Sequence, residues 1–417
     1  MSSGRKALLS SYEDVWLVDG VRTPFVEYNT ALGLVSATDL GIKAAREVFR
    51  RSGISPGDVN TVVAGNVAQT SFDAYVLPRH IALYSRVPVE VPAHLVQRVC
   101  GTGIEAILQA ADSIKLAKAE LALVVGAESM SRNPIAAYTH RSGFRMGEVE
   151  FKDFLWEALL DPSCNLTMGG TAEKLAKQFG ITREDVDRFA AESFARAIAA
   201  QKRCFLSGEI APVISEQFEL QGYATRGIRL PRGVENLNED THVRPSRMEV
   251  LSKLRPAFDG VQTGGNSSGI VDGAAAALVA SGSYLKKLNK QPLARVVAGS
   301  VVGVPPEIMG IAPVPAIQAV LESCGMKLDQ VDRVEINEAF GAQVLACQRE
   351  LGLDVAKLNV NGGAIAIGHP LAATGIRLAV TVARELKQSG LRYGVASACI
   401  GGGQGIALLV ENTSVGN

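Results

Sequence analysis

The order of apolar strands, helices and turns in the first part of the chain recurs loosely in its last part. Residues 15–18 form an apolar run, and a helical pattern ending near Gly53 leads through a Pro-Gly-Asp turn into a second apolar run at residues 62–64. Residues 296–298 begin a similar series, which leads through another helical pattern into residues 334–336. The repeat predicts two similar α/β halves, because each unit must bury one face of its sheet against a neighbour.

Strands alternate with helices within each half, and this alternation favours a parallel sheet. The run at residues 15–18 is expected to end at Asp19-Gly20 and to leave into a turn. Between the halves the pattern loosens into irregular stretches with one clear helix, capped by Thr182 with Asp185. The predicted domains are an N-terminal half at residues 1–128 and 269–292, an inserted loop domain at residues 129–268, and a C-terminal half at residues 293–417.

Composition limits the classes of function. The chain has 417 residues, 42 basic against 42 acidic side chains, and 47% hydrophobic residues, so it has a large core and no overall charge that would attract nucleic acid. Its six cysteines show no zinc-like spacing, which favours reduced thiols, no metal site and a cytoplasmic location. The first residues show no long apolar segment, so neither a signal peptide nor a membrane span is expected.

Cys100 lies between an apolar run and a glycine-rich opening of a helix. Unpaired N–H groups at the start of a helix favour a thiolate over a thiol, so its pKa is expected to fall from about 8.5 to between about 3.5 and 7.5. Cys100 is therefore the candidate nucleophile. The alternative is a small buried hydrophobic residue, which is the common role of a lone cysteine.

Three further motifs carry polar chemistry. Asn337 follows an apolar strand, where its amide could donate to an oxyanion or cap the next helix. His369 lies in a glycine-rich loop before Pro370, where the backbone can approach a ligand, although a lone histidine is more often structural. Cys399 precedes a turn with four glycines in five positions, whose N–H groups are exposed.

Together these motifs resemble those of the thiolases. The resemblance runs from residue 18 to Gly405, and its most specific parts are the Gly-His-Pro motif at His369 and the Cys-Ile-Gly-Gly-Gly motif at Cys399. It also includes the segments at residues 98–100, 126–131 and 337–340. The family fold consists of two similar α/β halves in a five-layer αβαβα arrangement with an inserted loop domain, which agrees with the repeat and with the loosened middle segment.

The resemblance implies a thiolytic cleavage of 3-ketoacyl-CoA, or the reverse condensation, through an acyl-cysteine. Cys100 would take the acyl group, His369 would activate it, and Cys399 would move the substrate α-proton. Two oxyanion sites would serve this chemistry. One would comprise His369 with a water held by Asn337, and the other the backbone N–H groups of Cys100 and Gly401.

The resemblance also implies that acyl-CoA is a substrate, that no cofactor is permanently bound, and that the chain forms a homodimer or homotetramer. The inserted domain would bind coenzyme A, with Ser268 contacting the pantetheine arm, Met168 and Phe340 lining its tunnel, and Arg244 contacting phosphate. Thr167 replaces a histidine of the short-chain biosynthetic members, which favours longer acyl chains. A decarboxylating ketoacyl synthase and a binding scaffold without turnover are the competing interpretations.

Overall fold

The computed structural model describes residues 6–69, 73–138 and 140–415, and its main feature is a mixed sheet of eleven strands within these residues. The N-terminal half of this sheet contains β2 (Val15–Arg22), β15 (Val271–Ser281), β6 (Leu121–Glu128), β4 (Thr61–Gly65) and β5 (Ala93–Val96), in this order. The C-terminal half contains β16 (Ala294–Gly303), β19 (Gln404–Glu411), β18 (Tyr393–Ile400) and β17 (Arg333–Ile336). Two short edge pairings add β1 (Ala7–Ser11) and β3 (Val26–Glu27).

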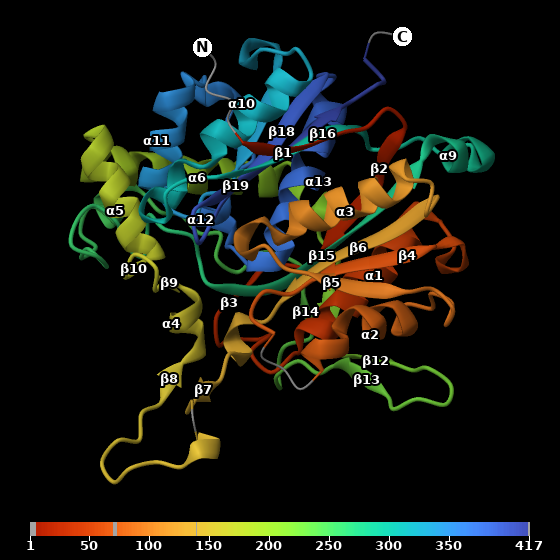
Figure 1. The fold of residues 1–417 in the computed structure, drawn as a ribbon, viewed down its shortest axis with the longest axis horizontal. Coiled ribbons are helices and arrows are strands. Elements are labelled where there is room, and N and C mark those ends of the chain that lie inside the picture. Colours follow the sequence, from red (N-terminus) through yellow and green to blue (C-terminus); the bar gives the residue numbers. More distant parts are fainter. Residues whose placement is uncertain (1–5, 70–72, 139, 416–417) are drawn as a thin grey trace.

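Helices cover both faces of each half. The outer helices are α1 (Ala37–Ser52) and α2 (Leu77–Tyr84) on the N-terminal half, and α10 (Pro313–Ser323) and α11 (Gly341–Leu351) on the C-terminal half. Two helices, α3 (Thr102–Lys115) and α13 (Leu371–Ser389), lie side by side between the two halves (Figure 1).

Alternation along the strands assigns each side chain to a layer, since neighbouring side chains on a strand point to opposite faces. In β15, Ala275 and Ala277 belong to the apolar cluster around α3 and α13, whereas Ala276 and Leu278 belong to the cluster under α1. In the other half, Leu408 packs in the central cluster and Leu409 under α10. The predicted five-layer αβαβα arrangement is therefore confirmed.

The prediction of a parallel sheet is wrong for most strand pairs. Only β4–β5, β4–β6 and β17–β18 are parallel in the described residues, whereas β15 runs antiparallel to both of its main neighbours and β18 pairs antiparallel with β19. The glycine turn between β18 and β19 is too short for the crossover that parallel strands need. Strand β2 also continues past the predicted turn at Asp19-Gly20 to Arg22, and Gly20, which has no side chain, leaves room there for Val380 of α13.

The segment between the halves contains more regular structure than the sequence indicates. The predicted helix is α6 (Arg183–Lys202), with Thr182 and Asp185 forming its capping box. A second helix, α5 (Met168–Phe179), was not predicted, because it opens on two glycines. An arm with β7 (Ile135–Ala136) and β8 (Lys152–Asp153) projects from the body and leads into α4 (Phe154–Ala158) (Figure 1). The domain boundaries stay a proposal.

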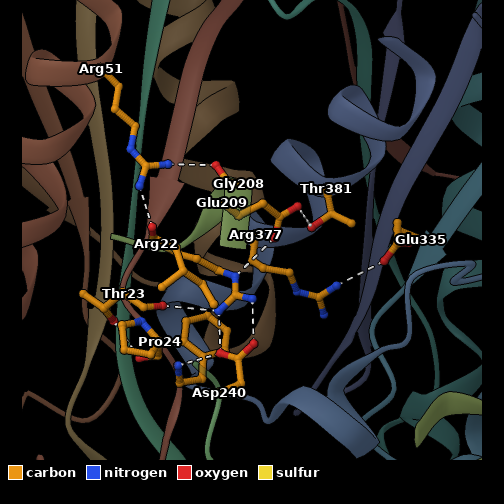
Figure 2. Close-up of polar contacts among 12 residues, drawn as sticks. Arg22, Thr23, Pro24, Arg51, Gly208, Glu209, Asp240, Glu335, Arg377 and Thr381 are labelled. Atoms are coloured by element: carbon orange, nitrogen blue, oxygen red, sulfur yellow. Dashed lines mark hydrogen bonds and ion pairs between the residues drawn. The ribbon is translucent and has the colours of Figure 1, made fainter. Parts of the chain in front are cut away.

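Buried ion pairs join this middle segment to the N-terminal half, and a buried hydrogen bond joins it to the C-terminal half (Figure 2). Arg22 at the end of β2 donates to Asp240 at 2.6 and 2.8 Å and to Glu209 at 3.3 Å. Glu209 also accepts a hydrogen bond of 2.8 Å from Thr381 on α13. Truncating one member would leave a buried charge unpaired, so the segment is held firmly against the helix that follows His369.

Candidate active site

Cys100 lies in a tight 3₁₀ turn, Val99–Gly101, that joins β5 to α3. The Thr102 hydroxyl closes this turn, since it accepts from the Arg98 N–H at 2.9 Å and donates to the Val99 carbonyl at 2.7 Å. Val99 adopts a φ of 42°, a strained conformation for a β-branched residue. The turn thus presents Cys100 at the start of α3 with 8% of its surface exposed.

Glycines bring the Cys100 helix against the His369 helix. A Cβ on Gly103 would lie 2.5 Å from the Ile376 nitrogen, and one on Gly375 would lie 2.3 Å from the Ile104 nitrogen. The two helix backbones therefore touch at a point near the starts of α3 and α13. This close packing places Cys100 and His369 at the same end of the central layer.

His369 follows α12 (Ala364–Ile367) and Gly368, whose φ of 104° is accessible chiefly to glycine. Its Nδ1 lies 2.6 Å from the Thr374 hydroxyl, and that hydroxyl lies 3.5 Å from the Pro370 carbonyl, to which it donates. The hydroxyl therefore accepts from Nδ1–H, which leaves Nε2 as the unprotonated nitrogen. Burial, with a smaller effect of the Arg377 charge, lowers the pKa of His369 to about 3, so the ring is neutral at pH 7.

Asn337 donates its amide N–H to this Nε2 at 3.3 Å. Its backbone N–H bonds the Ser397 carbonyl at 2.9 Å, and its buried Oδ1 has no hydrogen-bond partner within the described residues. Asn337 does not cap α11, because that helix begins at Gly341 with Phe340 in the capping position. The capping alternative is therefore wrong, and the amide faces the imidazole instead.

Cys399 lies near the end of β18 and is fully buried. The turn that follows contains Gly402 and Gly403 with φ of 85° and 81°, and a Cβ on Gly403 would lie 2.2 Å from the Val304 carbonyl. This turn directs the Gly401 N–H to hydrogen-bond with the Cys100 side chain. Burial raises the pKa of Cys399, and the neighbouring Cys100 adds to this effect.

The thiol of Cys100 is not the low-pKa group that its position before a helix predicts. Burial raises its pKa to about 11, although the Gly401 N–H and its own N–H favour the thiolate and the Glu128 carboxylate opposes it. The expectation of a lowered pKa is wrong because removal from water outweighs the two N–H groups. Without substrate, Cys100 is therefore a neutral thiol and His369 a neutral imidazole.

A pocket of about 410 Å³ reaches His369. Met168, Phe340 and Ser268 line it, together with His369 and Thr167. Gly401 reaches the same region, because a Cβ at that position would lie 3.2 Å from the Met168 sulfur.

Thr167, predicted to influence chain length, and Arg244, predicted to bind phosphate, both make contacts within the protein. Thr167 caps α5, since its hydroxyl accepts from the Gly170 N–H at 3.1 Å. Arg244 is not among the described residues that line the pocket; it forms a 2.8 Å ion pair with Glu27 at the surface.

Models of the thiolase N-terminal and C-terminal domains match residues 15–283 and 290–412 of the chain. The chain belongs to the thiolase family. This family membership confirms that the protein is an enzyme of CoA-dependent thiolysis or condensation, with coenzyme A and acyl-CoA as substrates, and it excludes the scaffold and ketoacyl-synthase interpretations.

The chain is similar over almost its full length to thiolases named for different substrates. It is 42% identical to the human mitochondrial 3-ketoacyl-CoA thiolase, covering 96% of this chain and 98% of that one. It is 41% identical to the β-ketoadipyl-CoA thiolase of Acinetobacter baylyi, covering 95% and 98%. The crystal structure of the human thiolase superposes with a TM-score of 0.91 over 96% of this chain and 99% of that chain, and its complex with CoA with a TM-score of 0.89 over 96% and 98%.

Three supporting residues of this thiolase site were missed in the sequence. Thr374 fixes the His369 tautomer. Glu338, next to Asn337, accepts from Ser193 at 2.6 Å and from the Ile365 N–H at 3.1 Å, and so holds the loop before His369. Glu128 accepts from the Ala372 N–H at 3.2 Å. Glu128 and Glu338 both belong to motifs that carry the resemblance, and buried carboxylates beside glycine-rich loops are the signal that could have revealed them.

Proposed function

We propose that Cys100, His369, Asn337, Cys399 and Gly401 carry out the thiolase reaction. One observation carries the proposal: His369, which contacts the Asn337 amide, lines a pocket of about 410 Å³, large enough for the arm of a CoA thioester. Cys100 and Cys399 pack against two further residues of its lining, Leu371 and Met168. Cys100 attacks the 3-keto carbon while His369 Nε2 takes the thiol proton. The bond between C2 and C3 then breaks, the acyl group stays on sulfur, and Cys399 protonates the acetyl-CoA enolate at C2.

Coenzyme A completes the cycle when its thiol gives its proton to the Cys399 thiolate and its sulfur attacks the acyl carbon. The bond from this carbon to the Cys100 sulfur breaks, and protonated His369 returns its proton to Cys100. The raised pKa values support this use of the two cysteines. A neutral thiol at Cys100 has a proton to give to a base, and a neutral thiol at Cys399 can donate a proton to a carbanion. The Gly401 N–H supports an oxyanion site beside Cys100, and the Asn337 amide supports a second one beside His369.

Incubation with acetyl-CoA followed by peptide mass analysis tests the first role. The acetyl group is expected on Cys100, and an adduct confined to Cys399 would reverse the assignment. Cys399→Ala should still acylate but should fail to exchange the α-protons of acetyl-CoA with deuterated water, whereas Cys100→Ser should lose turnover. Ordinary exchange by Cys399→Ala would refute its role in proton transfer.

The CoA-binding roles of Ser268, Met168 and Phe340 belong to the same proposal. Phe340 packs edge-to-face against Phe258 with ring centroids 6.3 Å apart, which gives the pocket an apolar wall suited to the pantetheine arm. For Arg244, a phosphate contact requires that it exchange Glu27 for the ligand. Arg244→Ala should therefore raise the KM for CoA without changing kcat, and an unchanged KM would remove it from the binding site.

We further propose a homo-oligomer and a cytoplasmic location. The projecting arm exposes apolar side chains that an isolated chain would leave in water, among them Ile135, Met146 and Phe151. All six cysteines are free, which suits a reducing compartment. No helix in the described residues is long and apolar enough to cross a membrane. Light scattering tests the first proposal and cell fractionation the second; a monomer, or an organelle-bound enzyme, would contradict them.

A further inference from the structure

The proposed oxyanion site beside Cys100 combines N–H groups from the two halves of the chain. The Cys100 N–H lies in the turn that joins β5 to α3, whereas the Gly401 N–H lies in the glycine turn between β18 and β19. Donors stabilise an oxyanion only when they lie about 2.7–3.1 Å from its oxygen. The contacts that hold one turn against the other therefore decide how well this site works.

Apolar packing holds only part of this junction. A Cβ on Gly101 would lie 2.5 Å from the Ile400 side chain, so the Cys100 turn packs directly on the end of β18. Residues 401–403 are glycines and offer no side chain for such packing, and the pairing of β18 with β19 ends at Ile400 and Gln404. A directional contact at Gln404, the first residue after this turn, would set the position of the Gly401 N–H.

Arg98 makes this contact. Its Nη1 donates to Gln404 Oε1 at 2.8 Å. In the part of the chain that the structure describes, no other hydrogen bond between side chains joins residues 97–103 to residues 399–405. Arg98 thus links the turn of the nucleophile to the turn that carries the second N–H group.

The Arg98 guanidinium is anchored on α3, the helix that follows the nucleophile. Its Nε donates to Glu105 in the first turn of this helix at 2.8 Å, and Glu105 also accepts from Gln109 at 3.0 Å. A guanidinium held at one nitrogen by a fixed carboxylate directs its other nitrogens along fixed lines, because the group is planar and rigid. The bond to Gln404 is therefore aimed by the same helix that begins after Cys100.

The Cys100 turn depends on such support. Val99, directly after Arg98, has a φ of 42°, and rare backbone conformations persist only where the surrounding structure holds them. The Arg98 N–H also donates to the Thr102 hydroxyl at 2.9 Å, so both the backbone and the side chain of this residue stabilise the turn. Without the side-chain contact, the two N–H groups are expected to drift apart.

We propose that Arg98 is a positioning residue for acyl transfer, whose bond to Gln404 holds the Gly401 N–H in place for the oxyanion that forms when Cys100 is acylated. This inference rests on the proposed function, since it requires acyl transfer to Cys100. Neither Arg98 nor Gln404 is among the described residues that line the pocket, so this contact acts on the rate of acyl transfer and not on the binding of coenzyme A.

Single-turnover acetylation of Cys100 by acetyl-CoA measures this step. The Cys100 sulfur bonds the acetyl carbon, the bond from this carbon to the CoA sulfur breaks, and CoA leaves as a thiol with the proton that Cys100 gave up. Arg98→Met keeps an unbranched side chain but removes its donors. It should slow acetylation at least about tenfold, because a small misplacement of reacting groups can cost up to about 100-fold.

A smaller fall in the acetylation rate of a folded Arg98→Met enzyme overturns the inference. Failure of the native enzyme to acetylate Cys100 overturns the proposed function instead, so the two failures are distinguishable.

Exchange of the α-protons of acetyl-CoA with deuterated water separates positioning from a general loosening of the site. This exchange uses Cys399 and the other oxyanion site, beside His369, and Cys399 is held by its pairing with Gly405 in the sheet. Exchange by Arg98→Met that is already acetylated should therefore stay close to the native rate. Equal losses of acetylation and exchange would show loosening and refute the positioning role.

Gln404→Met removes the same bond from the other half and provides a second variant in case Arg98→Met does not fold. It should slow acetylation to a similar extent, and the double variant should be no slower than the slower single variant, because both changes break one contact. Gln404→Glu keeps an acceptor for Arg98 and should recover most of the rate. Additive losses in the double variant would contradict the inference.

Arg295→Met is the matched control. The Arg295 side chain is 25% exposed, against 24% for Arg98, and its Nε donates at 2.9 Å to Glu411 at the opposite end of β19 from Gln404. Its substitution should leave the acetylation of Cys100 unchanged. A loss equal to that of Arg98→Met would mean that any buried arginine contact of this strand has the same effect, and the role of Arg98 would be refuted.

Discussion

The contact between His369 and Thr374 gives the most direct test of how the site is built. Thr374→Val keeps the shape of the side chain but removes the hydroxyl that accepts from Nδ1–H at 2.6 Å. The proton on Nδ1 then lacks an acceptor in a fully buried setting, and the tautomer with the proton on Nε2 becomes competitive, because it can donate to the Asn337 side-chain oxygen after an amide flip. That tautomer cannot take the Cys100 proton.

The expected loss of activity in Thr374→Val follows from the burial of the His369 ring and the Thr374 hydroxyl. An unsatisfied buried donor costs about 1–3 kcal/mol, and each 1.4 kcal/mol corresponds to a tenfold change in rate. Thr374→Val should therefore lower kcat/KM by about 5- to 150-fold, with most of the loss in kcat because substrate contacts are unchanged. Thr374→Ser retains the hydroxyl and should recover most of the activity.

Thr381→Val is the matched control. Thr381 lies on the same helix and donates to Glu209 at 2.8 Å, so its substitution also removes a buried hydroxyl without touching the imidazole. The assay is steady-state thiolysis of a 3-ketoacyl-CoA, with thermal unfolding of each variant alongside. The reasoning is refuted if Thr374→Val retains native kcat, or if Thr381→Val loses as much kcat at equal stability.

Three further predictions concern ionisation, packing and chain length. The pKa of Cys100 is raised to about 11, so its thiolate fraction at pH 7 is small. The rate of its alkylation by iodoacetamide should therefore rise about tenfold per pH unit from pH 7 to 10. An alkylation rate that stops rising below pH 8 would contradict this prediction. Gly103→Ala should destabilise the fold by about 1–3 kcal/mol in denaturant unfolding, because its Cβ would lie 2.5 Å from the Ile376 nitrogen, whereas Gly264→Ala, with open space around it, should cost less than about 0.5 kcal/mol. The native enzyme should cleave chains longer than four carbons at least as well as acetoacetyl-CoA, and Thr167→His should shift kcat/KM toward acetoacetyl-CoA. Thr167→Ser keeps the hydroxyl that caps the helix and should not cause this shift. A native preference for acetoacetyl-CoA that Thr167→His does not increase would refute the prediction.

The sequence determined the repeated architecture. Apolar periodicity is a local property, and it was sufficient to predict α1 with its end at Gly53, the capped start of α6 at Thr182, and two α/β halves. Strand direction was not predictable, because the direction of a neighbouring strand depends on which strands pair. The close pairing of β15 with β2 joins residues 250 or more positions apart, and nothing local indicates it.

The motifs likewise identified Cys100, His369, Asn337 and Cys399 as a set, since each stands beside glycines or at a strand end. Their environment was decided by the tertiary structure. Cys100 has the sequence of a helix-start thiolate, yet burial raises its pKa, because desolvation depends on every residue packed around it. The hydrogen bond to His369 Nε2 likewise comes from the Asn337 amide, which is 32 positions distant along the chain.

The supporting carboxylates also have environments that the sequence alone does not indicate. Glu128 and Glu338 are ordinary acidic residues in the sequence, and charged side chains are usually exposed. In the structure Glu128 is fully buried and accepts N–H bonds from residues 60 to 244 positions away. The sequence alone indicates which residues can carry out the chemistry. The packing of the two central helices and the two sheet halves decides the protonation state and the contacts of each residue, because both depend on groups that are distant along the chain.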